Sequence, residues 1–144
     1  MRVGLLDVNV LIALLWPEQE NHEKVQNWFK RHFAEGWATC ALTEAAFVRI
    51  VSNPAFSPAA VAPEEARKLL KDNVAHPNHE FWPAAIGYSE AVSPFAGRIG
   101  HKQVADAYLL GLAIHQQGRL VTMDRGILHL LPDSLQRRGL LTLI

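Results

Sequence analysis

The apolar run at residues 3–16 constrains the fold more than any other stretch of the chain. Its first residues, Val-Gly-Leu-Leu, are typical of a short strand buried on both faces in a parallel sheet. From residue 10 the apolar side chains recur at helical spacing until Pro17, which disfavours helical geometry in the residue before it. Asp7 lies between the two patterns, at the end of the strand where open α/β sheets bind ligands. A buried carboxylate there needs a partner, although Asp7 or Asn9 could instead simply cap the helix.

The rest of the chain alternates between strand-like and helix-like segments. Further strands are expected at residues 37–41, 79–82, 119–124 and 140–144, and helices at residues 21–34, 42–51, 84–90, 102–117 and from residue 63. Pro83 places the strand before it at a sheet edge, and Gly118 stands where a helix C-terminus favours glycine. This alternation indicates a single α/β domain over residues 1–144. We expect three α/β/α layers around a mostly parallel sheet of about five strands.

Charge and cysteine content exclude several classes of protein. The formal net charge is zero at pH 7, so a basic surface for a polyanion would have to be local. Cys40 is the one cysteine, which excludes a disulfide framework and a cysteine-rich zinc site and fits a reducing compartment. No stretch approaches the ~20 unbroken apolar residues of a membrane span. Asp7 and Asn9 interrupt the apolar start, so we expect no secretory leader, no membrane partner and a cytoplasmic location.

Four acidic residues stand out by their position. Asp7 and Asp124 end strands, while Glu44 and Asp106 stand near the starts of helices. The carboxyl ends of parallel strands and the amino ends of the helices that follow share one sheet edge, so all four acids can converge. Convergent carboxylates repel one another unless a cation neutralises them, and all-oxygen ligands select Mg²⁺ or Mn²⁺ over zinc. Singly, each acid has a simpler explanation, because acids favour helix N-termini and Asp124 can cap a turn before Gly126.

A cation at that edge suits phosphodiester or phosphoryl chemistry. It lowers the pKa of a water and neutralises charge on a phosphoryl oxygen. An RNA substrate would also need basic side chains for its backbone. Candidates for phosphate contacts are Arg49, Arg98, His101, Lys102 and Arg125, which precede or neighbour the acids. Solvated surface charge is the alternative explanation for each of them.

Four motifs resemble, in order and spacing, the successive acidic motifs of PIN-domain nucleases. They are LDVNVLI (residues 6–12), TE (43–44), VADAYLL (104–110) and LVTMDRG (120–126). Their flanking residues resemble those of the VapC toxins of bacterial toxin–antitoxin systems, as do FVR (47–49), SNP (52–54) and HEFWP (79–83). The resemblance covers nearly the whole chain, and the four motifs in order are far more specific than the DVN triplet alone.

The resemblance implies a PIN fold and a divalent-metal-dependent endoribonuclease that acts as the toxin of a type II toxin–antitoxin system. It implies that Mg²⁺, for which Mn²⁺ can substitute, is held by the catalytic residues Asp7, Glu44, Asp106 and Asp124. Asn9 and Thr122 would position water or a carboxylate nearby. The implied partners are an RNA substrate, a protein antitoxin that blocks the site, and a second copy in a homodimer. Neither the RNA that is cut nor the number of metal ions follows from it.

Two other functions are open at this point. A phosphotransferase of the haloacid-dehalogenase type also begins with an acid at a strand end. Its mechanism needs a general acid two residues after the nucleophile, a role that the Asn9 amide cannot fill. The second alternative is a non-catalytic PIN-like domain that binds RNA or a protein without cutting. Against it, unused buried carboxylates only destabilise a fold.

Overall fold

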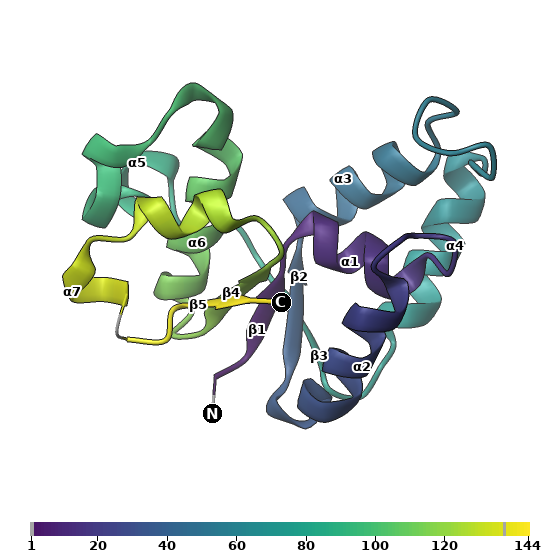
Figure 1. The fold of residues 1–144 in the computed structure, drawn as a ribbon, viewed down its shortest axis with the longest axis horizontal. Coiled ribbons are helices and arrows are strands. Elements are labelled where there is room, and N and C mark those ends of the chain that lie inside the picture. Colours follow the sequence, from purple (N-terminus) through teal and green to yellow (C-terminus); the bar gives the residue numbers. More distant parts are fainter. Residues whose placement is uncertain (1, 137) are drawn as a thin grey trace.

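The computed structural model describes residues 2–136 and 138–144, which form a five-stranded parallel sheet. The strands are β1 (Gly4–Leu6), β2 (Trp37–Cys40), β3 (His79–Trp82), β4 (Arg119–Thr122) and β5 (Leu141–Leu143). Their order across the sheet is β3-β2-β1-β4-β5, so β1 is central and β3 lies at an edge, as Pro83 predicts. Figure 1 shows the strands in the middle of the molecule with helices on both sides. The expected parallel sheet is confirmed.

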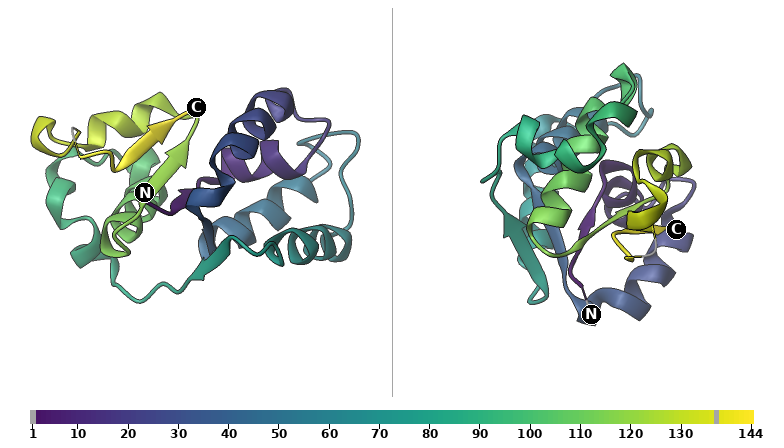
Figure 2. Two further views of the ribbon diagram at one scale, coloured as in Figure 1. Left: turned by 90° about the horizontal axis from the view of Figure 1, so that it is seen from below. Right: turned by 90° about the vertical axis from the view of Figure 1, so that its left-hand side faces the viewer.

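Helices cover both faces of this sheet, as Figures 1 and 2 show. Leu5 packs into the core on one face and Leu6 into the core on the other, because successive side chains of a strand point in opposite directions. The three expected layers are therefore confirmed. None of the helices in the described ranges has the length and apolarity needed to cross a membrane. One layer holds α1 (Val8–Leu15), α2 (His22–His32), α3 (Ala41–Val51) and α4 (Pro63–Val74), and the other holds α5 (Tyr88–Ala91), α6 (Val104–His115) and α7 (Asp133–Gln136).

Short 3₁₀ helices join these elements at several places. They are η1 (Phe33–Glu35), η2 (Ser93–Arg98), η3 (His101–Gln103) and η4 (Arg125–Leu130). Along the chain, η2 and η3 precede α6, and η4 follows β4. Gln103 fastens two of them together, since its side-chain amide donates to the Gly126 carbonyl at 3.1 Å. These short helices therefore border the carboxyl ends of the strands, where the acids are expected.

The chain changes its direction across the sheet at β1. It runs from β1 outward through β2 to β3, and then returns to β4, which lies on the other side of β1. Ligands of open α/β sheets bind outside the carboxyl ends of the strands at such a point. Asp7 directly follows β1, and Asp124 stands two residues after the end of β4. The topology therefore brings these two predicted acids to the place where a ligand is expected.

The end of α6 differs from the sequence expectation in detail. Gln117, not Gly118, adopts the left-handed backbone conformation, with φ of +59°. Gly118 is needed for a different reason, because a Cβ there would lie 2.6 Å from the Val3 carbonyl oxygen and against the Trp82 ring. The glycine lets the chain pass close to the Val3 backbone and the Trp82 ring as it turns into β4.

The prediction of a helix over residues 84–90 is wrong in its extent. Only one turn forms, α5, which begins after Gly87, and the separate 3₁₀ helix η2 begins at Ser93, with Pro94 in its first turn. Proline disfavours α-helical geometry in the residue before it, so the two short helices do not merge. Val92 and Phe95 are buried in the core beside α6, which holds this irregular segment against the sheet.

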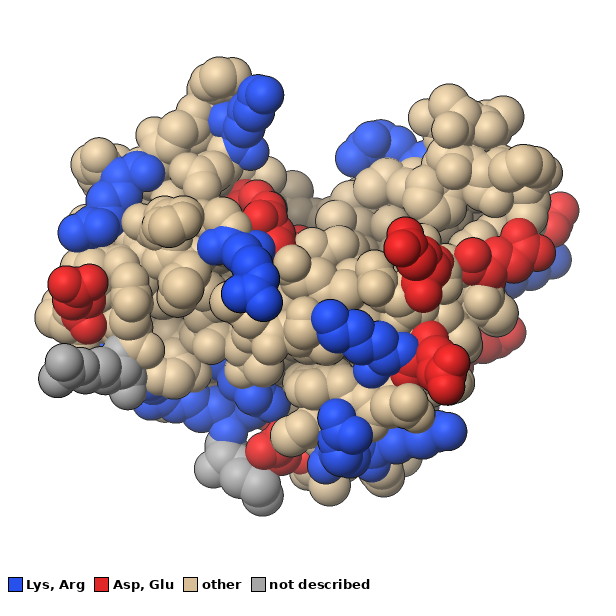
Figure 3. Space-filling model, viewed as in Figure 1, with Lys and Arg blue, Asp and Glu red and all other residues tan. Residues whose placement is uncertain are grey.

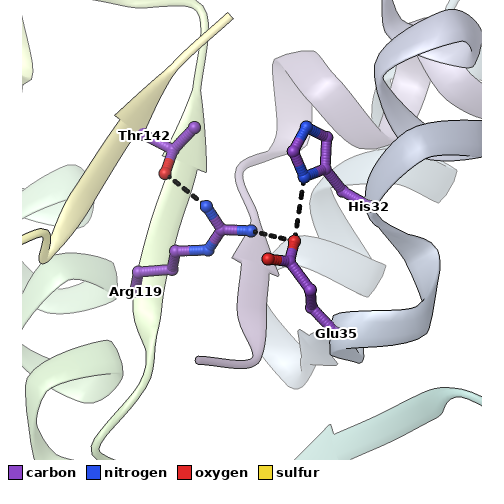
Figure 4. A network of polar contacts seen from close by, with 4 residues as sticks. All are labelled: His32, Glu35, Arg119 and Thr142. Carbon is purple, nitrogen blue, oxygen red and sulfur yellow. Dashed lines mark hydrogen bonds and ion pairs between the residues drawn. The ribbon is translucent and has the colours of Figure 1, made fainter. Parts of the chain in front are cut away.

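A charged bridge ties one helical layer to the sheet near the amino end of β4 (Figure 4). Arg119, the first residue of β4, donates to the Glu35 carboxylate at 3.2 Å and to the Thr142 hydroxyl at 2.7 Å. Glu35 also contacts His32 Nδ1 at 2.9 Å, and the guanidinium lies 5.9 Å from the Trp28 ring centroid. The side chain of Arg119 is only 15% exposed, so this bridge joins α2 and η1 to β4 and β5 in a largely dry environment.

Gly111, in the middle of α6, marks the place where α5 packs against that helix. A Cβ at this position would overlap the Ala91 carbonyl group of α5. Alanine has a helix propensity about 1 kcal/mol better than glycine, but overpacking a core costs about 1–3 kcal/mol. We expect Gly111→Ala to lower the free energy of unfolding measured in urea. Gly87→Ala is the control, because a Cβ there meets no atom within 4 Å. A Gly111→Ala protein as stable as the wild type would contradict this packing.

Candidate metal centre

Asp7 is the buried anchor of the site. Its side chain follows β1 at the start of α1 and is only 3% exposed. Oδ1 accepts a hydrogen bond from the Val8 backbone N–H at 2.7 Å, and Oδ2 accepts one from the Thr122 hydroxyl at 2.7 Å. Burial raises the pKa of Asp7 above its ordinary value, the two hydrogen bonds oppose that shift, and the charge of Asp124 adds to it. The capping role and the site role are therefore compatible, since one carboxylate carries both.

Thr122 connects the end of β4 to Asp7. While its hydroxyl donates to Asp7, its oxygen accepts from the Asp124 backbone N–H at 3.0 Å and from the Asn9 side-chain amide at 3.3 Å. The Asn9 carbonyl oxygen faces the Met123 backbone N–H at 3.4 Å. Asn9 and Thr122 thus lie beside Asp7, where the sequence motifs place them.

Asp106 and Asp124 face Asp7 from two other elements. Asp106 lies half-buried in the first turn of α6. Its pKa is raised to about 6, first by burial and then by the charges of Asp7 and Asp124. Asp124 is exposed and caps η4, because its Oδ1 accepts from the Gly126 backbone N–H at 2.8 Å. Asp124 therefore does cap a turn, as the simpler explanation holds, and its charge also raises the pKa of Asp7 and of Asp106.

Glu44 takes a different position from the other three acids. It lies in the first turns of α3, and its Oε2 accepts a hydrogen bond from the Thr39 hydroxyl at 2.6 Å. Its charge does not figure among the causes of the raised pKa values of Asp7 and Asp106. In the described ranges no three Asp, Glu, His or Cys side chains are gathered tightly enough to hold a metal ion. The structure thus brings three predicted acids into mutual electrostatic contact and leaves Glu44 to the side.

Sequence reasoning did not single out Thr39. It is a fully buried polar residue of β2, and its hydroxyl also contacts His79 Nε2 at 2.8 Å. His79 is part of the HEFWP motif and lies on β3, half-buried beside Thr39. The available signal was a threonine inside an otherwise apolar buried strand, five residues before a predicted acid. A buried hydroxyl needs a hydrogen-bond partner, and this one has two.

A cavity of about 380 Å³ opens between α3 and α6, with Asp7 at the start of α1. Figure 3 shows a hollow between the two halves of the molecule, with acidic side chains beside it and Lys and Arg side chains on either side. The walls of the cavity are largely apolar, so water solvates charged groups there poorly. The cavity is lined by Asp7, Val8, Leu42, Thr43, Ala45, Ala46, Arg49, Ala105, Asp106 and Leu109.

The predicted phosphate contacts all lie at the surface. Arg49, on α3, lines the cavity together with Asp7 and Asp106. The other four stand on the short helices of the opposite layer and are exposed: Arg98 on η2, His101 and Lys102 on η3, and Arg125 on η4. One of the five predicted basic residues therefore lines the cavity and the other four do not, and none of the five forms an ion pair with a carboxylate in the described part of the chain.

The donor set fits a hard divalent cation. All the side-chain groups that converge are oxygen donors, which Mg²⁺ and Mn²⁺ prefer. The charged form of Asp106 is disfavoured by burial and by two neighbouring carboxylates, and a bound cation would reverse that balance.

Comparison with known proteins points to one family. The family model described as PIN domain matches residues 4–130. Ribonuclease VapC38 of Mycobacterium tuberculosis is 40% identical over 125 residues, covering 87% of each chain. Ribonuclease VapC39 of the same organism is 39% identical over 131 residues, covering 86% of this chain and 90% of the relative.

Solved structures share the fold. VapBC2 from Rickettsia felis, crystallised with a DNA fragment from its promoter, gives a TM-score of 0.61 at 14% identity, over 99% of this chain and 97% of that one. FitAcB from Neisseria gonorrhoeae gives 0.57 at 21% identity, over 89% and 92% of the two chains. At these identities the likeness concerns the arrangement of elements, and it agrees with the sheet order and layers described above.

The raised pKa of Asp106 predicts how stability depends on pH without metal. A raised pKa means that the folded protein binds the proton more tightly than the unfolded chain, so stability falls as pH rises from the ordinary value of 3.8 to about 6. Asp106→Asn should reduce that fall and stabilise the protein above pH 6 by on the order of 1 kcal/mol, after allowance for solvent screening. Urea unfolding in EDTA between pH 4 and 7.5 measures it. Asp72→Asn, an exposed substitution on α4, is the control, and an unchanged pH profile in Asp106→Asn would count against the raised pKa of Asp106.

Proposed function

The chain belongs to the PIN-domain family, and from this premise we propose that it is a divalent-metal-dependent endoribonuclease that hydrolyses RNA phosphodiester bonds. The observation that carries the proposal is the gathering of Asp7, Asp106 and Asp124 at the carboxyl end of the sheet, where burial and then the neighbouring charges raise the pKa of Asp7 and of Asp106. A fold keeps such a costly group of charges where a cation and a substrate phosphate use it. The names of the Mycobacterium tuberculosis relatives as ribonucleases support the same activity.

Asp7 and Asp106 are the proposed primary ligands of Mg²⁺, with Mn²⁺ as a substitute, and Glu44 and Asp124 complete the acidic set. When bound, the cation would supply an activated water and neutralise charge on the phosphoryl oxygen. Asp7 is kept in one orientation by Val8 and Thr122, each of which occupies one of its oxygens and leaves further lone pairs free. The Asn9 side-chain amide donates to the Thr122 hydroxyl oxygen, so Asn9 helps Thr122 to keep Asp7 in that orientation.

The RNA backbone would lie across the hollow between α3 and the opposite layer. Arg49 lines the cavity, while Arg98, His101, Lys102 and Arg125 are exposed on the short helices η2, η3 and η4 of that layer. Phosphate contacts of this kind position a nucleic acid without reading its sequence. We therefore assign these five residues to backbone binding.

The proposed biological role is the toxin of a type II toxin–antitoxin system, acting in the cytoplasm, where its RNA substrate would be found. The names of the relatives and the VapBC assemblies among the solved structures support a cognate antitoxin partner. We also propose a homodimer. An antitoxin that blocks the site would restrain the nuclease until it is released.

The two alternatives fare differently. A haloacid-dehalogenase mechanism needs a proton donor at Asn9, but the Asn9 amide is committed to Thr122 and Met123 and has no acidic proton to give. A non-catalytic RNA- or protein-binding domain could use Asp7 as the cap of α1, but it would have no use for the half-buried charge of Asp106 beside it. RNA cleavage and metal-dependent thermal unfolding distinguish both alternatives from the nuclease.

We expect the purified protein to cut a mixed pool of cellular RNA with Mg²⁺ or Mn²⁺ and not with EDTA. Asp7→Asn should lose cleavage by at least about a hundredfold, because a neutral amide removes the buried charge that would hold the cation. Gel electrophoresis of the RNA, with sequencing of the cut ends, measures this. The Asp72→Asn protein should cut like the wild type. Undiminished cutting by folded Asp7→Asn would refute the assigned centre, and phosphorylated protein trapped in acid would instead favour a phosphotransferase.

Metal binding is measured separately by thermal unfolding. A ligand that binds only the folded state stabilises it by about 2.7 kcal/mol at a hundred times its Kd. Mn²⁺ should therefore raise the Tm of the wild type and of Asp72→Asn but leave that of Asp7→Asn unchanged. If Mn²⁺ and Mg²⁺ both leave the wild-type Tm unchanged and no RNA is cut, the non-catalytic domain becomes the better explanation.

A further inference from the structure

A chain of hydrogen bonds connects Glu44 to the edge strand of the sheet. Thr39, on β2, donates its hydroxyl proton to Glu44 Oε2 at 2.6 Å and contacts His79 Nε2, on β3, at 2.8 Å. Thr39 has no exposed surface, so water does not compete for its hydroxyl. The His79 ring packs edge-on against Trp37, with 4.6 Å between ring centroids, and this contact restricts its orientation.

The direction of these hydrogen bonds follows from the groups involved. A threonine hydroxyl has one proton, and the short distance to Glu44 is that of a charge-assisted bond to a carboxylate. In the His79 tautomer that carries its proton on Nε2, the Thr39 oxygen accepts from that nitrogen. The order of donation in that tautomer is His79 to Thr39 to Glu44.

This chain of bonds decides where the Glu44 carboxylate lies. Its neighbours Thr43 and Ala45 line the cavity, whereas Glu44 does not. One carboxylate oxygen is taken by Thr39, and the other, Oε1, accepts no hydrogen bond from the described residues. Glu44 is thus held beside the cavity by one oxygen with the second oxygen unused.

We propose that Thr39 and His79 are positioning residues for Glu44, which hold Oε2 and so limit the orientations in which Oε1 can serve the cation. This inference rests on the proposed function, because it takes Glu44 to be part of the acidic set. Carboxylates that bind metals are themselves usually held by hydrogen bonds, and removing such a partner typically weakens metal affinity about 10- to 100-fold. The proposal also assigns a role to His79, the first residue of the HEFWP motif, because its ring nitrogen contacts the Thr39 hydroxyl.

A double-mutant cycle tests the proposal. Thr39→Val removes the hydroxyl and keeps the shape, Thr39→Ser keeps the hydroxyl, and Glu44→Gln removes the charge that it holds. Calorimetric titration with Mn²⁺ should show affinity about tenfold weaker in Thr39→Val and close to wild type in Thr39→Ser. In the Glu44→Gln background, Thr39→Val should cause no further loss, since both changes act through one carboxylate.

A matched control separates positioning from general stability. Thr142→Val also removes a hydroxyl that contacts a charged side chain, that of Arg119, and should lower the Tm without changing Mn²⁺ affinity. His79→Leu should weaken Mn²⁺ binding as Thr39→Val does, whereas His79→Gln keeps an N–H donor and should weaken it less. Equal Mn²⁺ affinity in Thr39→Val and wild type, or additive losses in the double variant, would overturn the proposal.

Thermal unfolding in EDTA keeps this test separate from the test of metal binding. If the hydrogen bond exists in solution, Thr39→Val and Glu44→Ala, which removes the acceptor, should each lower the Tm, and the double variant should lower it by clearly less than the sum. Additive Tm losses would refute the bond itself, whatever the metal does. Coupled Tm values together with no Mn²⁺ binding by the wild type would instead overturn the proposed function, and with it the role of Thr39 and His79 toward a cation.

Discussion

The burial of one carboxylate at the end of the central strand is the constraint on which the surrounding structure depends. Asp7 can remain there only with fixed hydrogen-bond donors, and the most important of them comes from β4, more than a hundred residues later in the chain. The parallel register that pairs Leu6 with Val121 brings Thr122 level with Asp7. A slip of one residue would turn the hydroxyl to the opposite face of the sheet. The sheet register and the site are therefore specified together.

The acidic site opposes the stability of the fold that carries it. Burial and mutual repulsion disfavour the charged forms of Asp7 and Asp106. The two apolar layers offset this cost, with Leu5 and Leu6 buried on opposite faces of the same strand. Natural proteins often place locally unfavourable groups at functional sites and stabilise them from elsewhere. Here the unfavourable groups lie at the strand ends and the stabilising contacts lie within the sheet and its helices.

Local patterns predicted the elements better than they predicted side-chain directions. The strand signals and the order of acids were enough to place Asp7, Asp106 and Asp124 at one edge, because that follows from a parallel topology alone. The direction of Glu44 was not predictable, since each residue of a helix turns the next side chain by about 100°. A shift of one residue in the start of α3 decides whether it faces the cavity or β2. The partner of Glu44 is Thr39, and the other partner of Thr39, His79, comes from a strand 35 positions after Glu44, which no local pattern reveals.

The Arg119 bridge has a consequence for how the hollow responds to a ligand. Arg119 opens β4 and Thr122 closes it, so the bridge and the acids stand at opposite ends of one strand. The same guanidinium holds Glu35, on η1, and Thr142, on β5, so it fastens one helical layer to two strands of the sheet at the end away from the hollow. Because β4 is held at its amino end, its carboxyl end keeps Thr122 in a fixed place, and little conformational entropy is lost there when a ligand binds.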